Sequence, residues 1–477
     1  MDKLILKVIL CFCVLAMAGC AVGPNYHPQE ANVPSAWTGT TNPIKATSAY
    51  ADLVHWWTGF NDPNLSSLVE RAINSNLDLL QAHARIRQAR AARGITAGGL
   101  WPTADATGSY LRSRSPDSGD SDATTRNLFQ TGLDAAWEMD VFGGVRHSVE
   151  AAEADVQFAV EDHRDVLVTL VSEVAINYVE LRGFQQEIVI ARNNLAAQQK
   201  TADLTHKKFQ GGIVGTLDVA NADAQVATTA SQIPLLEAAA QQAIYNLSVL
   251  LGLEPAALLQ ELSPTYSIPE TPPEVPMGIP SEVLRRRPDI RRAEARIHGA
   301  TARIGIATAA LYPKFSLTGS INFQNNHLHE LINWKDRFGT AGPAVDWQIF
   351  SAGRVRSNIE LQKALSQESV LAYQKTVLTA IQDVENALVA YAKEHERHKT
   401  LVDAVTANRK AVDMATQLYT QGLTDFLNVL VAQRSLYASE DALVQSTRNL
   451  STDLVALYKA LGGGWDSDTS DIDRQKQ

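Results

Sequence analysis

The chain has 477 residues, enough for two or three ordinary domains, and a formal net charge of −10. That charge argues against nucleic acid as a partner, because a nucleic-acid-binding protein needs a basic face that neutralises phosphates. No Lys/Arg cluster of sufficient size appears outside "RRRPDIRR" at 285–292, and a solvated face is the expected position of that run. Long stretches that lack proline and nearly lack glycine predict very long helices instead.

The N-terminus carries all three cysteines, Cys11, Cys13 and Cys20, so the rest of the chain has no disulfide and no thiolate metal site. Residues 1–19 predict an export signal, since two lysines precede an apolar run too short to span a membrane. Small residues before Cys20 resemble a bacterial lipoprotein signal, which implies cleavage and an acylated Cys20 that bears a diacylglycerol group. An ordinary secretory signal with an incidental cysteine is the alternative.

The remainder of the chain is an internal duplication. At an offset of 210, Trp137 matches Trp347, Gly212 matches Gly422 and Leu217 matches Leu427, and an offset of 211 aligns "DLLQAHARI" with "DIRRAEARI". The predicted segments are an N-terminal extended segment at 20–65, a first repeat at 66–262, a proline-rich linker at 263–280, a second repeat at 281–462 and a polar tail at 463–477.

Each repeat changes from a helical period to a two-residue alternation after a proline. We predict strand hairpins at about 103–140 and 314–350, with strands of roughly ten residues, which is the length that spans a bilayer when tilted. Half-buried soluble sheets alternate in the same way and are the alternative. The side chains expected toward lipid are Phe315, Leu317, Ile321, Phe323, Leu133 and Trp137, and those expected toward the lumen are Ser316, Thr318, Ser320, Asn322 and Gln324.

Heptad repeats follow each hairpin and predict coiled coils. Residues at seven-residue spacing from 167 to 209 are all apolar, and the matching series from 377 to 419 is mainly so. A helix over 143–208 would be roughly 100 Å long.

Each long helix is expected to reverse at glycine, at Gly211-Gly212 and at Gly422, because glycine readily reaches left-handed backbone conformations. Return helices are predicted at about 217–250 and 426–461. Pro234 is expected to kink the first of them.

Four stretches resemble one known family: "WWTGFNDPNLSSLVERAINSNLDLLQAHARIRQAR", "WEMDVFGGVR", "DWQIFSAGRVR" and "LYTQGLTDFLNVLVAQRSLY". They are similar to the outer membrane factors, the TolC-like lipoprotein channels of tripartite efflux pumps, in the NodT-type branch. The resemblance implies a mostly α fold with a β-barrel part: a homotrimer whose chains each give four strands to a twelve-stranded barrel, continued by a coiled-coil α-barrel. Independently, four strands leave two open edges that a membrane does not tolerate, so copies must combine.

The sequence predicts no enzyme, because it has no phosphate loop, no G-x-S-x-G, no H-E-x-x-H and no thiolate pair. His395 and His398 lie three residues apart and could hold a metal, but polar positions in a coiled-coil interface are the better interpretation. Apart from the acyl groups on Cys20, no cofactor is expected.

The expected function is an outer-membrane channel that gives exported small molecules, such as drugs or toxic compounds, a passive exit from a Gram-negative cell. By resemblance, its partners are a periplasmic adaptor protein, an inner-membrane pump and outer-membrane lipids. A type I protein secretion outlet and a non-conducting coiled-coil surface lipoprotein are the alternatives.

The far ends of the helical hairpins carry the expected partner and gate residues. By resemblance, the adaptor meets the tips, here Gly211, Gly212, Ile213, Val214 and Gly215 in one repeat and Gly422, Leu423, Thr424 and Asp425 in the other, although these glycines could serve the turn alone. The family's acidic pair in the second tip is replaced by Asn428 and Val431, whereas Asp218 with Tyr419 resembles the clasp of the closed state. An apolar ring of Leu427 and Val431 is therefore expected, unless both only pack in the coiled-coil seam.

Overall fold

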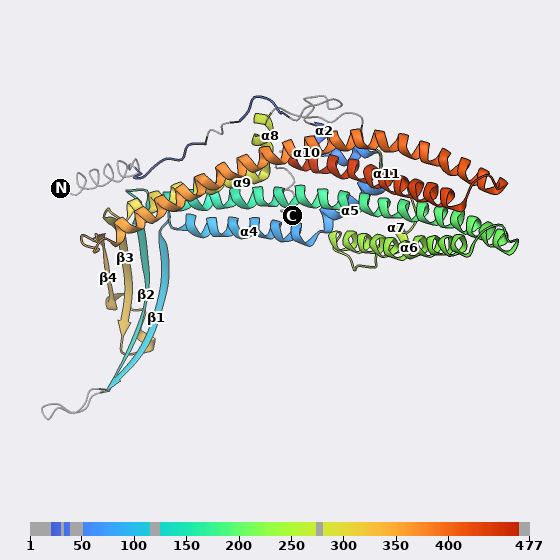
Figure 1. The fold of residues 1–477 in the computed structure, drawn as a ribbon. Coiled ribbons are helices and arrows are strands. Elements are labelled where there is room, and N and C mark those ends of the chain that lie inside the picture. The colour runs from blue at the N-terminus through green and yellow to red at the C-terminus, as the bar shows by residue number, and fades with distance from the viewer. Residues whose placement is uncertain (1–20, 30–32, 39–50, 115–124, 273–279, 467–477) are drawn as a thin grey trace. The chain divides into compact units, whose positions relative to one another are not determined.

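The computed structural model describes residues 21–29, 33–38, 51–114, 125–272 and 280–466 (Figure 1). The predicted signal and Cys20 lie outside the described residues. The predicted fold class is confirmed, because long helices dominate the described chain and one four-stranded sheet accompanies them. The elements are α2 (Ala51–Val54), η1 (Trp56–Phe60), α3 (Pro63–Ser75), α4 (Leu77–Gly98), β1 (Thr103–Arg114), β2 (Thr125–Met139), α5 (Gly144–Gln210), α6 (Thr216–Leu250), α7 (Leu259–Leu262), α8 (Pro280–Arg286), α9 (Pro288–Ala309), β3 (Lys314–Asn325), η2 (Leu328–Glu330), η3 (Trp334–Asp336), β4 (Arg337–Asp346), α10 (Arg354–Gln421) and α11 (Phe426–Ala460).

The same series of elements occurs twice along the chain. A helix, two strands, a very long helix and a return helix run from α4 to α6, and the series repeats from α9 to α11. The matching tryptophans make the same contact in each copy: Trp137 Nε1 donates to Leu100 O at 3.0 Å, and Trp347 Nε1 donates to Leu311 O at 3.1 Å. The internal duplication is therefore also a structural one.

Local hydrogen bonds divide the first helical stretch of the first repeat at Asn76. Asn76 ends α3 and starts α4, because its Oδ1 accepts from Leu79 N at 2.9 Å and its amide donates to Leu250 O at 2.9 Å. Pro234 lies inside α6, which continues through it. The segment at 20–65 is not extended throughout, since α2, η1 and the start of α3 lie within it.

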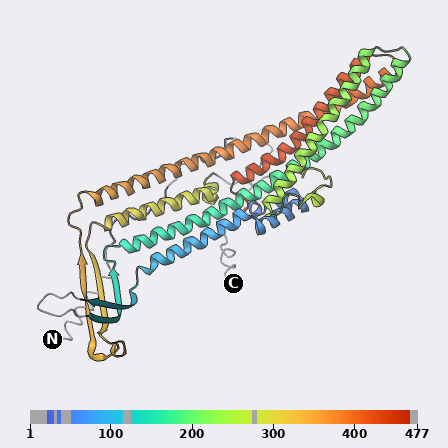
Figure 2. The same ribbon diagram turned by 90° about the horizontal axis from the view of Figure 1, so that it is seen from below.

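The chain divides into two compact units, and the first holds the sheet. It comprises residues 1–30, 85–160 and 292–374, of which the described part includes all four strands. The strands are antiparallel neighbours in the order β1-β2-β3-β4, so β1 and β4 form the two edges. Within this unit, parts of α4, α5, α9 and α10 lie in a row, with α4 and α10 at its two sides (Figure 2).

The strand register places the apolar side chains on one face of the sheet. Leu133 pairs with Ile321 and Trp137 with Leu317, so these four share a face. The neighbouring positions pair polar residues, and Ser320 lies 3.1 Å from Thr340 between their hydroxyl oxygens. The predicted alternation is therefore present across β2 and β3, and Leu133 and Leu317 are exposed in a single chain.

The second unit comprises residues 31–84, 161–291 and 375–477 and holds the largest apolar core in the described chain. Trp56 stacks on Tyr458 there, with ring centroids 5.1 Å apart. Trp465, in the segment expected to be a polar tail, is buried, and the Arg164 guanidinium lies 4.5 Å from its ring centroid. The described start of that segment, through residue 466, thus belongs partly to the core.

Two parts of the basic run contradict the expectation of a solvated face. Arg286 and Arg287 are buried, and Arg287 forms ion pairs with Asp289 at 2.8 Å and Asp383 at 3.0 Å. It also donates to Ala460 O at 3.0 Å. The run therefore ties the start of α9 to α10 and α11, and its carboxylate partners raise the pKa of Arg287 although burial opposes that rise.

Candidate gate and partner surface at the hairpin tips

The two hairpin turns have the same backbone geometry. Gly212 and Gly422 adopt φ of +69° and +78°, the left-handed region that only glycine enters without strain. Ile213 N donates to Lys208 O at 2.9 Å, and Leu423 N donates to Leu418 O at 2.9 Å, which closes each helix end. Since a Cβ on either glycine would meet no atom within 4 Å, the backbone conformation and not crowding requires glycine here.

The tips present apolar side chains to solvent at matching positions. Ile213 and its counterpart Leu423 are exposed, as are Leu217 and its counterpart Leu427. The other predicted adaptor-contacting residues are also at the surface or half-buried, namely Gly211, Gly212, Val214, Gly215, Gly422, Thr424 and Asp425. An exposed apolar patch at the end of a long hairpin is typical of a protein-binding surface.

A small apolar cluster lies beneath the tips, and we call it the tip core. Tyr419 is its largest buried side chain, and the Phe426 ring centroid lies 5.7 Å from that of Tyr419. The members of the tip core are Ala202, Ala222, Tyr419, Phe426, Val429 and Leu430. They come from all four hairpin helices, so the tip core holds the two hairpins together.

Tyr419 of α10 is fixed by polar contacts with α5. Its hydroxyl lies 3.0 Å from Thr205 Oγ1, and Lys208 Nζ lies 4.2 Å from its ring centroid and donates to Tyr419 O. Burial raises the pKa of Tyr419, and the nearby carboxylate of Asp218 adds to that rise. Tyr419 and Asp218 are thus brought close to each other, but the hydroxyl pairs with Thr205.

The predicted gate residues Leu427 and Val431 lie outside the tip core. Leu427 is 59% exposed and Val431 is 54% exposed, whereas Val429 and Leu430 between them are buried. Asn428 is exposed and donates from Nδ2 to Thr424 Oγ1 at 2.7 Å. Packing inside the hairpins of a single chain therefore does not explain why positions 427 and 431 carry the apolar residues Leu427 and Val431.

Polar pairs between the hairpins were not expected from the sequence. Gln433 donates to Thr201 Oγ1 at 3.0 Å, and Arg434 donates to Gln225 Oε1 at 2.6 Å. Both pairs join α11 to the first hairpin across more than two hundred positions of sequence. Thr201 and Thr205 share a face of α5, but neither belongs to the apolar heptad series from 167 to 209, so no periodic signal in the sequence marked them.

The heptad seams are buried in the N-terminal halves of α5 and α10 and are partly exposed to solvent further along these helices. Val174 and Val384 are buried, but Phe209 is 42% exposed although its counterpart Tyr419 is 1% exposed. His395 is exposed and His398 contacts Thr447 Oγ1 at 3.2 Å, so His395 does not lie in a closed seam. Among the described residues, no group of three or more potential ligands could hold a metal ion.

A carboxylate pair lies between α5 and α11, with Glu187 buried and Asp441 half-buried. Glu187 contacts Arg448 at 3.3 Å, and burial raises the pKa of Glu187 to about 7 despite that arginine. The nearby carboxylate of Asp441 contributes to the rise, and burial raises the pKa of Asp441 as well. Both residues line a pocket of about 300 Å³.

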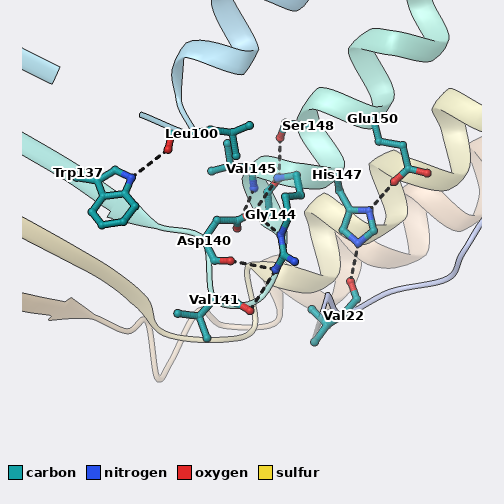
Figure 3. A network of polar contacts seen from close by, with 11 residues as sticks. Val22, Leu100, Trp137, Asp140, Val141, Gly144, Val145, His147, Ser148 and Glu150 are labelled. Carbon is teal, nitrogen blue, oxygen red and sulfur yellow. Dashed lines mark hydrogen bonds and ion pairs between the residues drawn. The ribbon is translucent and has the colours of Figure 1, made fainter. Parts of the chain in front are cut away.

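The strand-to-helix corner of the first repeat is held by Asp140, whose carboxylate accepts the backbone N–H of Val145 at 3.1 Å and of Arg146 at 2.8 Å (Figure 3). These bonds satisfy free N–H groups at the start of α5. The Arg146 guanidinium returns a hydrogen bond to Asp140 O at 3.0 Å. The corner therefore fixes the direction in which α5 leaves the sheet.

The N-terminal strap, residues 21–29, is seated at the same corner. Val22 N donates to Phe142 O at 3.1 Å. His147 Nε2 donates to Val22 O at 3.1 Å (Figure 3). Further along, Tyr26 donates to Glu294 at 2.9 Å. A Cβ at Gly143 would lie 2.8 Å from Ala21 Cβ. A larger residue at this position would therefore collide with the start of the strap.

None of the helices in the described part of the chain combines the length and the apolar character of a bilayer-spanning helix.

A sheet with one apolar face, joined to two very long helical hairpins, defines a class of protein: the subunit of an outer-membrane channel with a helical extension. The chain belongs to the outer membrane efflux protein family, whose model matches residues 68–253 and 279–463. It is similar to the pyoverdine export outer membrane protein OpmQ of Pseudomonas aeruginosa, at 34% identity over 97% of each chain. It is also similar to nodulation protein T of Rhizobium leguminosarum bv. trifolii, at 32% identity over 95% of this chain and 96% of that one.

The fold comparison agrees with the sequence comparison. The solved outer-membrane channel OprN superposes with a TM-score of 0.87 and 35% identity, covering 94% of this chain and all of that one. The predicted function is therefore confirmed at this level: the protein is an outer-membrane efflux channel component. Family and relatives are channel proteins and not enzymes.

Proposed function

We propose that three copies of this chain form the exit duct of a tripartite efflux pump, through which small molecules leave the cell passively. The supporting observation is the sheet, which has open edges at β1 and β4 and one apolar face. Edge backbone groups have no partner inside a bilayer, so copies have to join edge to edge. The number three is taken from the family and not from the geometry of one chain.

A conductance measurement tests this proposal. The purified complex should open stable pores in planar bilayers, and it should co-purify with an adaptor and an inner-membrane pump. A coiled-coil scaffold would give no conductance. A protein secretion outlet would conduct but would co-purify with a transporter for polypeptides, which would remove the small-molecule assignment.

The tips would receive the periplasmic adaptor. Exposed Ile213 and Leu423 offer apolar contact area, and the neighbouring glycines let another helical hairpin approach the backbone. Replacing both Ile213 and Leu423 by Ser should abolish pump function while the complex still assembles. Full drug resistance in that variant would show that these side chains do not bind the adaptor.

The N-terminus would carry a lipid anchor on Cys20. The strap supports this, because it holds Ala21 beside Gly143 at the end of the sheet. An acyl chain attached one residue earlier would then start near the membrane-facing part of the first unit. Mass spectrometry of the mature N-terminus should find cleavage before Cys20 and added acyl groups. An unmodified Cys20 would refute the anchor.

The resting duct would be closed at the tips by an apolar constriction. Leu427 and Val431 are exposed in one chain and would form rings when copies surround an axis. Narrow apolar rings exclude water and thereby ions. Tyr419 and Asp218 would act beside this ring by holding the hairpins in the closed position.

A further inference from the structure

Charged side chains divide unequally between the two faces of the sheet. The strand register puts the even-numbered positions of β1 and the odd-numbered positions of the other three strands on the apolar face. Within the four described strands, no carboxylate occurs at these positions, and the only cations there are Arg112, Arg114 and Arg337. The acidic residues of the strands lie on the polar face and are Asp105, Asp134, Glu138 and Asp346. The charge of the apolar face is therefore purely positive, although the chain carries a net charge of −10.

All three arginines lie at the end of the sheet that points away from the helices (Figure 1). The strand β1 runs outward from α4, and Arg112 and Arg114 are near its outer end. The strand β4 returns toward α10, and Arg337 is its first residue. At the helical end, Lys314 lies on the polar face, where it is 3.7 Å from Glu138. The positive charge of the apolar face is thus confined to its outer end.

Aromatic side chains border the arginines on the same face. Tyr110 precedes the arginines of β1 and stacks on Phe129, with ring centroids 4.7 Å apart. Phe323 pairs with Arg337, and Phe315 on the same face lies roughly 27 Å away along β3. The apolar band of a membrane barrel is about 25 Å tall and is bordered by aromatic residues. The arginines therefore lie where that band would meet the headgroups of the outer leaflet.

The loop between β3 and β4 adds apolar and basic groups at this place. Trp334 is 64% exposed, and its ring centroid lies 6.4 Å from that of Phe323. The Arg337 guanidinium lies 4.4 Å from the Trp334 ring centroid and donates to Trp334 O at 2.6 Å. Lys335 beside them is exposed. An indole fits the boundary between acyl chains and headgroups, and a planar guanidinium presents several N–H donors to phosphate oxygens.

The carboxylates of this loop have other partners. Asp336 Oδ2 accepts from Asn325 Nδ2 at 2.7 Å, and Glu330 lies 3.6 Å from His329 Nε2. Among the described residues, none of the three arginines of the apolar face pairs with a carboxylate. The described chain therefore leaves these cations to an anion from outside.

We infer that the outer end of the apolar face binds phosphate-bearing lipids of the outer leaflet. Arg112, Arg114 and Arg337 contact the phosphate groups, and Tyr110 and Trp334 lie against the acyl chains. Charge complementarity selects this occupant, because a phosphorylated lipid combines the anion that the arginines require with the chains that the apolar band requires. The inference rests on the proposed function, since only a sheet that lies in a membrane barrel presents this face to lipid.

Binding of lipid A, a glycolipid with two phosphate groups, tests the inference on the purified, delipidated complex in detergent. Native mass spectrometry should detect bound lipid A, and a titration gives its Kd. Arg337→Gln should weaken binding about fivefold, and Arg112→Gln/Arg114→Gln roughly 25-fold if the two effects add. The matched control is Arg126→Gln, because Arg126 is exposed at the same end of β2 but lies on the polar face. The control should leave the Kd unchanged.

Two further ligands separate the phosphate contact from other causes of binding. Lipid A stripped of both phosphates should bind the parent no better than it binds the Arg112→Gln/Arg114→Gln/Arg337→Gln variant. Inorganic phosphate that displaces lipid A at equal phosphate concentration would mean an adventitious ion only, and the inference would be wrong.

Conductance separates failure of this inference from failure of the channel proposal. The triple variant should conduct like the parent in planar bilayers, because its substitutions lie on the face turned away from the lumen. Equal lipid A affinity in parent and triple variant would overturn the lipid site and leave a conducting channel in place. A parent complex that opens no pore would overturn the channel proposal, and the lipid-facing position of the site would fall with it.

Discussion

Tyr419→Phe removes one hydroxyl from the tip core and little else. Thr205 Oγ1 donates to Thr201 O at 2.9 Å, so the Tyr419 hydroxyl is the donor in its contact with Thr205. The substitution leaves one acceptor site on Thr205 without a partner. The phenyl ring keeps its contact with Phe426 and its place beside Lys208. The change therefore isolates a single tie between α5 and α10.

The magnitude follows from one neutral hydrogen bond. Such a bond contributes about 0.5–1.5 kcal/mol, and each subunit of the proposed trimer would lose one. If the three tips open together, the closed state loses roughly 1.5–4.5 kcal/mol, which multiplies the ratio of open to closed channels by about ten to about two thousand. Tyr419 is 1% exposed and Thr205 is 0% exposed, so bulk water does not reach the acceptor site on Thr205 that the substitution leaves without a partner.

Single-channel recording in planar bilayers is the assay. The Tyr419→Phe channel should show more frequent or larger openings, and cells that carry it should admit a large antibiotic that the parent excludes. Thr205→Val removes the same bond from the other side, so the double variant should be no more open than either single variant. Phe209→Ala, at the exposed counterpart of Tyr419, is the matched control. Additive effects of the two substitutions, or unchanged conductance in both, would refute the tie.

Four further outcomes are expected. Leu317→Arg on the apolar face should destabilise the assembled sheet by about 2–4 kcal/mol, whereas Thr318→Arg should mainly change conductance; equal assembly defects would show a different register. Val431→Ser should raise conductance, because a hydroxyl wets an apolar ring; an unaltered pore would exclude Val431 from the constriction. Burial raises the pKa of Glu187 to about 7, so the native chain holds that proton longer than the unfolded one and stability should fall between about pH 4.5 and 7. Glu187→Gln should flatten the plot of melting temperature against pH over that range. An unchanged slope would show that a different group causes the pH dependence. Arg182→Met should lower the unfolding free energy by roughly 2–4 kcal/mol, because Pro264 O and Gln185 Oε1 lose the donor that the Arg182 guanidinium supplies; a melting temperature within one degree of the parent would contradict this.

Features with a local period could be predicted from the sequence. Strand alternation fixes which side of β3 Leu317 occupies, and a glycine between two long apolar series fixes the turn at Gly422. Both depend on neighbouring residues alone. The duplication adds a second copy of each pattern, so an error in one repeat would have appeared as a mismatch with the other.

Features that depend on distant partners could not be predicted. Arg287 looked like part of a solvated basic run, but its ion pair with Asp383 joins positions that no local pattern connects. Trp465 lay in an apparently polar tail and is buried under Arg164. Charged and aromatic residues near segment ends carry no periodic signal, so their burial is decided by tertiary packing.

The tip site combines both kinds of feature, and its asymmetry bears on which hairpin moves. Phe209 and Tyr419 are counterparts, yet Phe209 is 42% exposed while Tyr419 is 1% exposed and contacts α5. The second hairpin therefore buries Tyr419 against the first hairpin, whereas the first hairpin does not bury Phe209 in the same way. Opening that withdraws Tyr419 exposes a large ring and breaks its bond to Thr205, whereas displacement at Phe209 changes little buried area. In the proposed gate, the barrier to opening would therefore be concentrated on the second hairpin, and an adaptor that binds beside Leu423 would meet the hairpin on which that barrier depends.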